Sequence, residues 1–263
     1  MTLGIIEKGI NETAFAHAAG FGLDFVEFCV NGDCNEADLL EHIPELKDWM
    51  KKYGVAIGSI GRWKTTILDE SGNIVPEEQE LAKKLMSAAA ELGCDNYVCG
   101  CNYCEKLSLD ENIRQAVSFF SQVLADRPQG MKVSVYNCWK MNFVDRPEIW
   151  TRMLPQLPEL GIKYDPSHAI NGGRDYLREL LDWGDRVYHV HLKGSMVIDG
   201  EHVDDPPAGM DQTDWLAVLA ILRAKGYDRG LSIEPHSPVW KGALGEKGIA
   251  YTVEYFDSLL VER

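Results

Sequence analysis

The chain has 263 residues and a formal net charge of −15, because 41 acidic residues outnumber 26 basic ones. Hydrophobic residues make up 45% of the chain and charged residues 25%, which is typical of a globular protein and excludes disordered, collagen-like and membrane-spanning chains. The acidic excess excludes nucleic acid as a partner, because a surface that follows phosphates needs clustered basic residues.

Eight short apolar runs alternate with eight longer stretches of helical periodicity. In chain order the predicted strands are Leu3–Ile6, Phe25–Val30, Val55–Ile60, Tyr97–Cys101, Val133–Cys138, Ile162–Tyr164, Val187–Leu192 and Leu231–Glu234. The predicted helices lie near residues 11–20, 37–53, 77–93, 110–126, 146–158, 174–184, 213–226 and 245–261. Helix starts are expected at Asn11, Pro76, Asp110 and Thr213, and helix ends at Gly20, Gly54, Gly93, Gly161 and Gly226.

This alternation predicts one α/β domain over residues 1–263, a (β/α)8 TIM barrel, which typically needs about 250 residues. An open doubly wound sheet is the alternative. It would require a glycine-rich phosphate loop directly after an early strand, and no such loop is present in the sequence.

The first residues lack the basic and apolar regions of a secretory signal, and no apolar stretch is long enough to cross a membrane, so we expect a cytoplasmic protein without a membrane partner. The seven cysteines are then expected to be free thiols. Cys99, Cys101 and Cys104 have the spacing of part of a metal site. However, no second Cys or His pair follows at a usual distance, so free thiols are favoured.

Imidazole and carboxylate side chains gather at the ends of the last three predicted strands, where TIM-barrel enzymes place their active sites. One imidazole with two carboxylates suits a divalent ion, with Mn, Co, Mg and Zn as candidates. Strand alternation puts His189, His191 and Lys193 on one face of the seventh strand and Ser232, Glu234 and His236 on one face of the eighth. His189 lies nearer the middle of its strand and is interpreted as a core residue. The residues at these strand ends are Asp165, His168, His189, His191, Lys193, Glu234 and His236.

Other polar and aromatic residues are candidates at the barrel mouth. Arg62 can grip an oxyanion, and Trp63 and Trp139 can stack on a sugar ring, although some of the seven tryptophans must simply pack in the core. Glu27 interrupts an apolar strand, so it either faces the mouth or pairs with a buried cation. The proline-containing loop 195–212 is either a lid over the substrate or a surface excursion.

Three motifs resemble the sugar phosphate isomerase/epimerase family of xylose isomerase-like TIM barrels. They read Ile162-Lys-Tyr-Asp165-Pro-Ser-His168, Tyr188-His-Val-His191-Leu-Lys193 and Gly230-Leu-Ser-Ile-Glu234-Pro-His236. The resemblance implies that Asp165, His191 and Glu234 bind the metal, with Mn the first choice. It also implies that Glu234 transfers a proton and that His168 binds substrate oxygens. His236 joins His168 as a candidate substrate-binding residue.

One expected residue is missing from this resemblance. Family members usually carry a glutamate at the end of the fifth strand, as fourth ligand and second acid/base, but Tyr136 stands there in this chain. Tyr136, Asn137, Lys193 or a neighbouring carboxylate could take over its role. Endonuclease relatives need several additional His and Glu ligands on the earlier strands, and no His is present on the first, third, fourth or fifth predicted strand.

The sequence therefore predicts a divalent-metal-dependent isomerase or epimerase that removes a proton next to the carbonyl of a sugar or keto-sugar. The metal would stabilise the resulting enediolate, with Glu234, Lys193 and Tyr136 as catalytic candidates. Two alternatives stay open. One is a dehydratase or lyase acting on a keto-sugar, keto-glycoside or cyclitol, and the other is a non-catalytic sugar-binding subunit. The sequence leaves homo-oligomer formation open.

Overall fold

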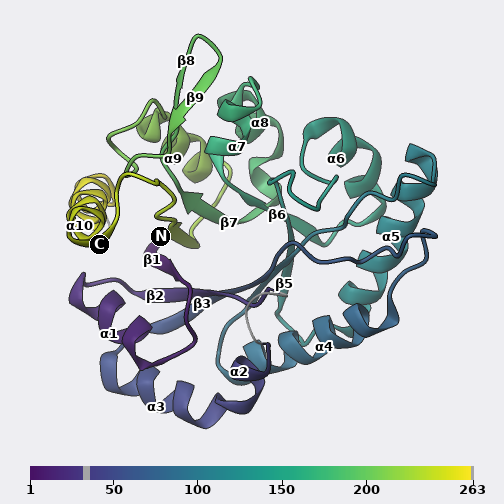
Figure 1. The fold of residues 1–263 in the computed structure, drawn as a ribbon, viewed down its shortest axis with the longest axis horizontal. Coiled ribbons are helices and arrows are strands. Elements are labelled where there is room, and N and C mark those ends of the chain that lie inside the picture. Colours follow the sequence, from purple (N-terminus) through teal and green to yellow (C-terminus); the bar gives the residue numbers. More distant parts are fainter. Residues whose placement is uncertain (32–35, 262–263) are drawn as a thin grey trace.

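Eight parallel strands close into a barrel in the computed structural model, which describes residues 1–31 and 36–261 (Figure 1). Around the barrel the strands follow the order β1-β10-β7-β6-β5-β4-β3-β2. Their bounds are β1 Thr2–Glu7, β2 Phe25–Cys29, β3 Ala56–Arg62, β4 Asn96–Cys99, β5 Lys132–Tyr136, β6 Leu160–Tyr164, β7 Val187–Leu192 and β10 Gly230–Ile233. Each predicted strand overlaps one of these, so the (β/α)8 barrel is confirmed.

Helices surround the barrel and cover the outer face of its strands (Figure 1). They are α1 Glu12–Gly20, α2 Glu36–Glu41, α3 Ile43–Tyr53, α4 Pro76–Glu91, α5 Leu109–Asp126, α6 Pro147–Met153, α7 Pro166–Asn171, α8 Tyr176–Trp183, α9 Trp215–Ala224 and α10 Gly242–Leu259, with short 3-10 turns at Leu154–Gln156 and Gly184–Arg186. The single helix predicted over 37–53 is wrong, because the structure divides it at His42. Pro44 has no backbone N–H for the carbonyl four residues earlier, which accounts for the break.

Helix starts depend on side chains that accept the first free backbone N–H groups. Asn11 caps α1 as predicted, with its side chain accepting from Ala14 N. Two other predicted starts are wrong by one or two residues. Ser108 rather than Asp110 caps α5, in a reciprocal capping box, and Asp214 rather than Thr213 caps α9.

Glycines mark helix ends at Gly20, Gly54, Gly93 and Gly226, as predicted. Gly54 has a φ of 67°, a left-handed conformation that costs least at glycine. The predicted end at Gly161 is wrong, because Gly161 lies inside β6. A Cβ there would lie 2.1 Å from the Tyr188 ring, so the glycine allows that ring to cover the strand.

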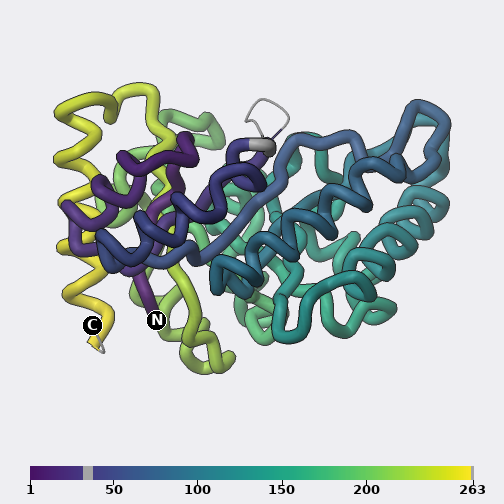
Figure 2. The backbone as a smooth tube through the Cα atoms, turned by 90° about the horizontal axis from the view of Figure 1, so that it is seen from below, coloured from purple at the N-terminus to yellow at the C-terminus, as the bar shows by residue number. Residues whose placement is uncertain are grey.

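The two ends of the described chain meet at one seam of the barrel. Strands β1 and β10 pair in parallel from Thr2↔Gly230 to Ile5↔Ile233. Figures 1 and 2 show α10, in yellow, beside the purple N-terminal segment. The ring of His17 on α1 spans this seam, contacting Glu7 at 2.5 Å and Glu246 at 3.1 Å. No helix among the described residues is long and apolar enough to cross a membrane.

The loop between β7 and α9 carries a small hairpin that projects from the barrel (Figure 1). Its strands are β8 Met196–Ile198 and β9 Glu201–Asp204, joined by a turn at Asp199-Gly200. Both turn residues have positive φ, 51° and 83°, as the tight hairpin turn requires. The loop 195–212 is therefore partly ordered by its own hydrogen bonds.

Candidate active site

The predicted polar residues converge at the C-terminal ends of β6, β7 and β10. Asp165 directly follows β6 and caps α7, with its Oδ1 accepting from Ser167 N at 2.9 Å. His191 lies on β7, Lys193 directly follows β7, and Glu234 directly follows β10. Because the strands are parallel and adjacent, their carboxyl ends bring these four side chains to one place.

Asp165 is completely buried and faces several cationic or basic groups. Its Oδ2 lies 3.1 Å from Lys193 Nζ, 3.3 Å from His168 Nε2 and 4.0 Å from Lys163 Nζ. No described residue donates a hydrogen bond of good geometry to this oxygen. Asn137 holds the backbone of Asp165 through two reciprocal hydrogen bonds of 2.9 and 3.0 Å. Asp165 is thus fixed by its backbone and Oδ1, while Oδ2 retains acceptor capacity.

His191 lies between two carboxylates from different strands. Its Nδ1 is 2.8 Å from Glu234 Oε2, and its Nε2 is 3.0 Å from both oxygens of Glu27 on β2. His189 contacts the same Glu27 carboxylate at 2.7 Å through Nε2. Glu27 therefore contacts two imidazoles inside the barrel. His189 is buried, in agreement with its interpretation as a core residue.

The charges of this cluster stabilise one another. Burial alone would raise the pKa of Asp165, but Lys193 and His168 hold that pKa below its ordinary value. Burial likewise works to raise the pKa of Glu234, yet Lys193 and His191 keep it well below the usual range. Burial would lower the pKa of Lys193, but the two carboxylates raise it above its ordinary value. Asp165 and Glu234 are therefore ionised at neutral pH and Lys193 is an ammonium.

His168 stands beside this cluster as a neutral imidazole. Its Nε2 is 3.4 Å from Lys193 Nζ and 3.3 Å from Asp165 Oδ2. Burial is the main cause that lowers the pKa of His168 to about 3, and the nearby ammonium of Lys193 acts in the same direction. A neutral ring can accept a hydrogen bond or donate one, which suits the predicted contact with substrate oxygens.

Two aromatic rings stand at the barrel mouth. Trp63 follows β3, across the barrel from β7, and Tyr136 ends β5, beside β6. The ring centroid of Trp63 is 4.5 Å from that of Tyr136 and 5.9 Å from that of His191. The Tyr136 hydroxyl is 3.4 Å from Lys64 N, from which it accepts, and 3.4 Å from Lys140 O, to which it donates. Burial raises the pKa of Tyr136 well above its ordinary value. The phenol at the strand-five position therefore contacts backbone groups at the rim.

Two further predicted residues have contacts away from the Asp165–His191–Glu234 cluster. Arg62 is buried and donates to both carboxylate oxygens of Glu78, at 3.1 and 2.8 Å, and to Val30 O at 3.1 Å. Trp139 is 65% exposed in the loop after β5. The Arg62 guanidinium is thus held inside the barrel wall by Glu78. The Trp139 ring is exposed at the rim.

The loop 195–212 is held against the segment that follows β10 by the carboxylates of Asp204 and Asp205. Asp205 contacts His236 Nδ1 through Oδ2 at 2.8 Å and His202 Nε2 through Oδ1 at 2.9 Å, while Asp204 accepts from Ser237 Oγ at 2.7 Å. A Cβ at Gly194 would lie 2.0 Å from Pro206 O, so this glycine permits the close approach of the loop.

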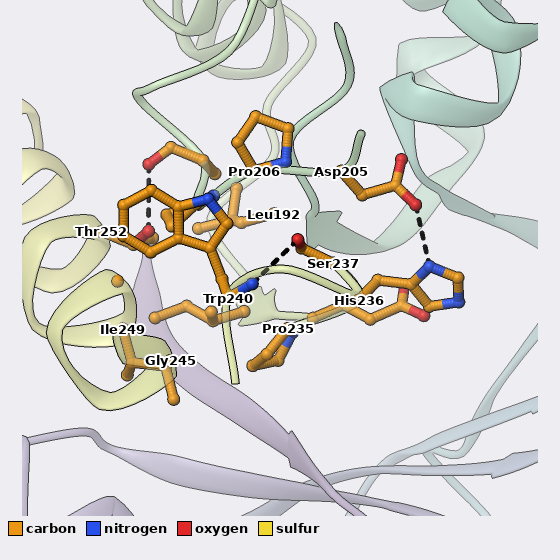
Figure 3. Close-up of a pocket in the computed structure, with 15 residues that line it drawn as sticks. Leu192, Asp205, Pro206, Pro235, His236, Ser237, Trp240, Gly245, Ile249 and Thr252 are labelled. Carbon is orange, nitrogen blue, oxygen red and sulfur yellow. Dashed lines mark hydrogen bonds and ion pairs between the residues drawn. The ribbon is translucent and has the colours of Figure 1, made fainter. Parts of the chain in front are cut away.

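A pocket lies between this loop and α10. Figure 3 shows Asp205 and His236 on one side and Trp240, Ile249 and Thr252 on the other. Glu234 also lines this pocket. The loop thus forms one wall of a cavity that reaches the carboxylate at the end of β10.

All seven cysteines were expected to be free. The six that the structure describes are free, and Cys34 lies outside the described residues. Cys99, Cys101 and Cys104 are buried. Burial raises the pKa of Cys99 and that of Cys101 well above the ordinary value of a thiol, which disfavours the thiolates that a metal site requires. The free-thiol interpretation of this cluster is supported.

Within residues 1–31 and 36–261, two groups of side chains have the spacing of a metal site. One is Asp165, His191 and Glu234, as predicted, and the other is Glu27, His189 and His191. In each group the ligand atoms all lie within 4.8 Å of one another.

Lys163 is a further charged residue beside the cluster, at a position that the sequence motifs did not mark as functional. It is buried on β6, and its Nζ lies 5.1 Å from the centroid of the Trp63 ring and 4.0 Å from Asp165 Oδ2. Its position two residues before Asp165 is the alternation signal that could have found it.

The sequence profile described as xylose isomerase-like TIM barrel matches residues 15–259. No curated protein sequence matches the chain.

Three similar solved structures extend the comparison. A D-allulose 3-epimerase from Methylomonas sp. has 17% identity and a TM-score of 0.76, covering 99% of this chain and 98% of that one. A 3-keto-D-glucoside 4-epimerase from E. coli has 16% identity and a TM-score of 0.73, covering 96% and 98%. A probable 3-DHS dehydratase from Bacillus anthracis has 14% identity and a TM-score of 0.71, covering 98% and 99%. At these identities the likeness establishes a shared fold.

Proposed function

Because this chain belongs to the xylose isomerase-like TIM barrel family, we propose that it is a divalent-metal-dependent epimerase or isomerase of a sugar or keto-sugar. The observation that carries the proposal is the set of Asp165, His191 and Glu234, whose ligand atoms lie within 4.8 Å of one another. This set lies at the barrel end where enzymes of this fold act. Sugar epimerases among the similar solved structures support the same reaction class.

The donor set suits a divalent ion. The buried Oδ2 of Asp165 accepts no hydrogen bond of good geometry from any described residue, so it has lone pairs to offer. Two carboxylates and one imidazole are ligands that Mn, Co, Mg or Zn accept, and Mn is our first choice. Asp165, His191 and Glu234 would hold the ion. When bound, it would act as a Lewis acid that polarises the substrate carbonyl and stabilises the negative charge developing beside it.

Each neighbouring side chain has a role that follows from its protonation state. Glu234 is ionised and borders the pocket, so it can accept the proton from the carbon next to the carbonyl. Lys193 remains an ammonium, so it would donate a hydrogen bond to a substrate oxygen rather than act as a base. Neutral His168, beside Lys193, would bind an adjacent hydroxyl.

The wall opposite these charges suits a neutral sugar. Trp63 lies near His191 and Lys163 and would offer its ring to the apolar face of the substrate. Arg62, the predicted grip for an oxyanion, donates to both carboxylate oxygens of Glu78. This pairing favours an uncharged keto-sugar over a phosphorylated one.

A dehydratase is the second candidate, and the strand-five position favours it. Epimerisation with one carboxylate on each face needs a second acid/base, and the Tyr136 hydroxyl instead contacts the backbone of Lys64 and Lys140. A single carboxylate can remove a proton and return it to a leaving hydroxyl on the same face. The probable dehydratase of the same fold supports this option.

Solvent exchange separates these functions. The protein would be incubated in D2O with Mn2+ and either D-allulose or a 3-keto-D-glucoside, and the products followed by NMR and mass spectrometry. Deuterium next to the carbonyl, absent in Glu234→Gln and after chelation, is expected for the epimerase or isomerase. Loss of water from the product identifies the dehydratase. If a broad panel of keto-sugars and polyols shows neither, the catalytic proposal is refuted in favour of a sugar-binding subunit.

A further inference from the structure

A carboxylate is buried beneath the proposed metal ligands. Glu27 on β2 is completely inaccessible to solvent, although strand positions of this kind usually carry apolar side chains. It accepts from His189 Nε2 at 2.7 Å, and His191 Nε2 lies 3.0 Å from each of its two oxygens. A charge at this depth is tolerated because both of its oxygens have nearby nitrogen partners.

The contact with Glu27 sets the orientation of the His191 ring. Nε2 lies 3.0 Å from both oxygens of Glu27, so Nδ1 faces the other way, toward Glu234, 2.8 Å from Oε2. Between two carboxylates both ring nitrogens can donate. A divalent ion would take the place of the hydrogen on Nδ1, while Nε2 would keep its hydrogen toward Glu27.

We propose that Glu27 is a positioning residue that fixes His191 as its Nε2–H tautomer and so directs the Nδ1 lone pair at a divalent ion. The inference rests on the proposed function, because the ion would lie among Asp165, His191 and Glu234. Metal-ligating histidines generally donate their second nitrogen to a carboxylate or carbonyl, which sets ring orientation and increases ligand basicity.

The same contacts argue against a second ion among Glu27, His189 and His191. These three residues have the spacing of a metal site, but both oxygens of Glu27 have imidazole partners at 2.7 to 3.0 Å, whereas Oδ2 of Asp165 in the other group has no hydrogen-bond partner among the described residues. His189 supplies a second donor to Glu27. Glu27 therefore positions His191, and both imidazoles donate to this one carboxylate.

The test replaces Glu27 by Gln, which keeps the shape but offers one acceptor and one donor atom. Two N–H groups face this position, so at least one imidazole must change its tautomer or lose its partner. Glu179→Gln is the matched control. Glu179 is also a buried glutamate, bound to Tyr164 Oη at 2.9 Å and Arg174 Nε at 2.6 Å, and neither of these partners is a proposed metal ligand.

Co2+ affinity would be measured by titration of the visible absorption bands in wild type and both variants, with circular dichroism to verify folding. Loss of such a supporting partner typically weakens metal binding by about 10- to 100-fold. We expect this loss in Glu27→Gln and wild-type affinity in Glu179→Gln. Equal affinity in wild type and a folded Glu27→Gln overturns the inference, as does an equal loss in both variants.

A second measurement on the unmodified chain keeps the inference testable if Glu27→Gln does not fold. Long-range 1H–15N NMR of the Zn2+-loaded protein reports which nitrogen of His191 carries the hydrogen. A proton on Nε2 supports the inference, and a proton on Nδ1, or failure of the wild type to take up either ion, overturns it. Normal metal binding without solvent exchange into any sugar would refute only the proposed reaction.

Discussion

Replacing Asp165 by Asn removes the negative charge closest to Lys193 while keeping the size of the side chain. The distance of 3.1 Å between Asp165 Oδ2 and Lys193 Nζ corresponds to an attraction of about 5 kcal/mol at an effective dielectric constant of about 20. Glu234, at 3.7 Å, still compensates part of the ammonium charge. Breaking a buried ion pair costs about 3–5 kcal/mol, so we expect a loss of about 3 kcal/mol in the free energy of unfolding.

The measurement is urea unfolding followed by circular dichroism in the presence of EDTA, so that only the charges of the chain contribute. Asn retains the cap on α7, because Asn and Asp are comparable capping residues. Lys193→Met and the Asp165→Asn/Lys193→Met double variant complete a double-mutant cycle. We expect the double variant to lose less stability than the sum of the single variants, by about 2–3 kcal/mol.

A loss below about 1 kcal/mol for Asp165→Asn would be the value of an exposed ion pair and would refute this reasoning. Strict additivity of the two single variants would refute it too, since it would mean that Asp165 and Lys193 do not stabilise each other.

Three further predictions follow from contacts elsewhere in the barrel. Burial acts to lower the pKa of His17, but Glu7 raises it overall, so the stability from charged His17 is present below about pH 6.5 and is lost as the pH rises through the folded-state pKa. His17→Gln should cost about 1 kcal/mol in urea unfolding near pH 6 and less in alkaline buffer. Gly100→Ala should cost about 1–3 kcal/mol in the same assay, because its Cβ would lie 2.6 Å from the Tyr136 ring. Trp63→Ala should lower kcat/KM for a sugar by about tenfold through loss of stacking, measured by solvent exchange.

Each of these predictions has an outcome that contradicts it. A stability difference for His17→Gln that grows with pH would show that the ionised imidazole is not the stabilising form. Unchanged unfolding of Gly100→Ala would mean that Tyr136 has room to move. Activity retained by Trp63→Ala would remove the indole from the binding site, and Trp139→Ala, at the exposed rim, serves as its comparison.

The strand and helix order was predictable because each βα unit carries its own period of apolar residues. The boundaries of the helices were less predictable, because neighbouring side chains compete to cap the same backbone groups. Ser108 caps α5 since its side chain and that of Glu111 satisfy each other's backbone donors, whereas Asp110 is already within the helix. Gly161 was predicted as a helix end. It lies inside β6 instead, where the absence of a side chain leaves room for the Tyr188 ring of the neighbouring strand. That contact depends on which strands pair in the barrel, and a local stretch of sequence does not reveal this pairing.

The candidate site divides in the same way. Strand alternation brought Asp165, His191 and Glu234 to one predicted centre, and the structure places them there. The partners of Glu27 could not be predicted, because β2 and β7 are far apart in the sequence and meet only across the barrel. The contacts of Asp205 with residues beyond β10 likewise depend on the path of a long loop.

The two walls of the barrel mouth differ in chemistry, and this difference has a stereochemical consequence for the proposed reaction. The titratable groups Asp165, His191, Lys193 and Glu234 lie at the ends of β6, β7 and β10, whereas Trp63 follows β3 on the other side of the barrel and packs against the Tyr136 ring at the end of β5. A planar enediol between these walls would exchange protons with one face only. Proton removal and return would then be suprafacial, and a product inverted at that carbon would require the sugar to turn over within the site.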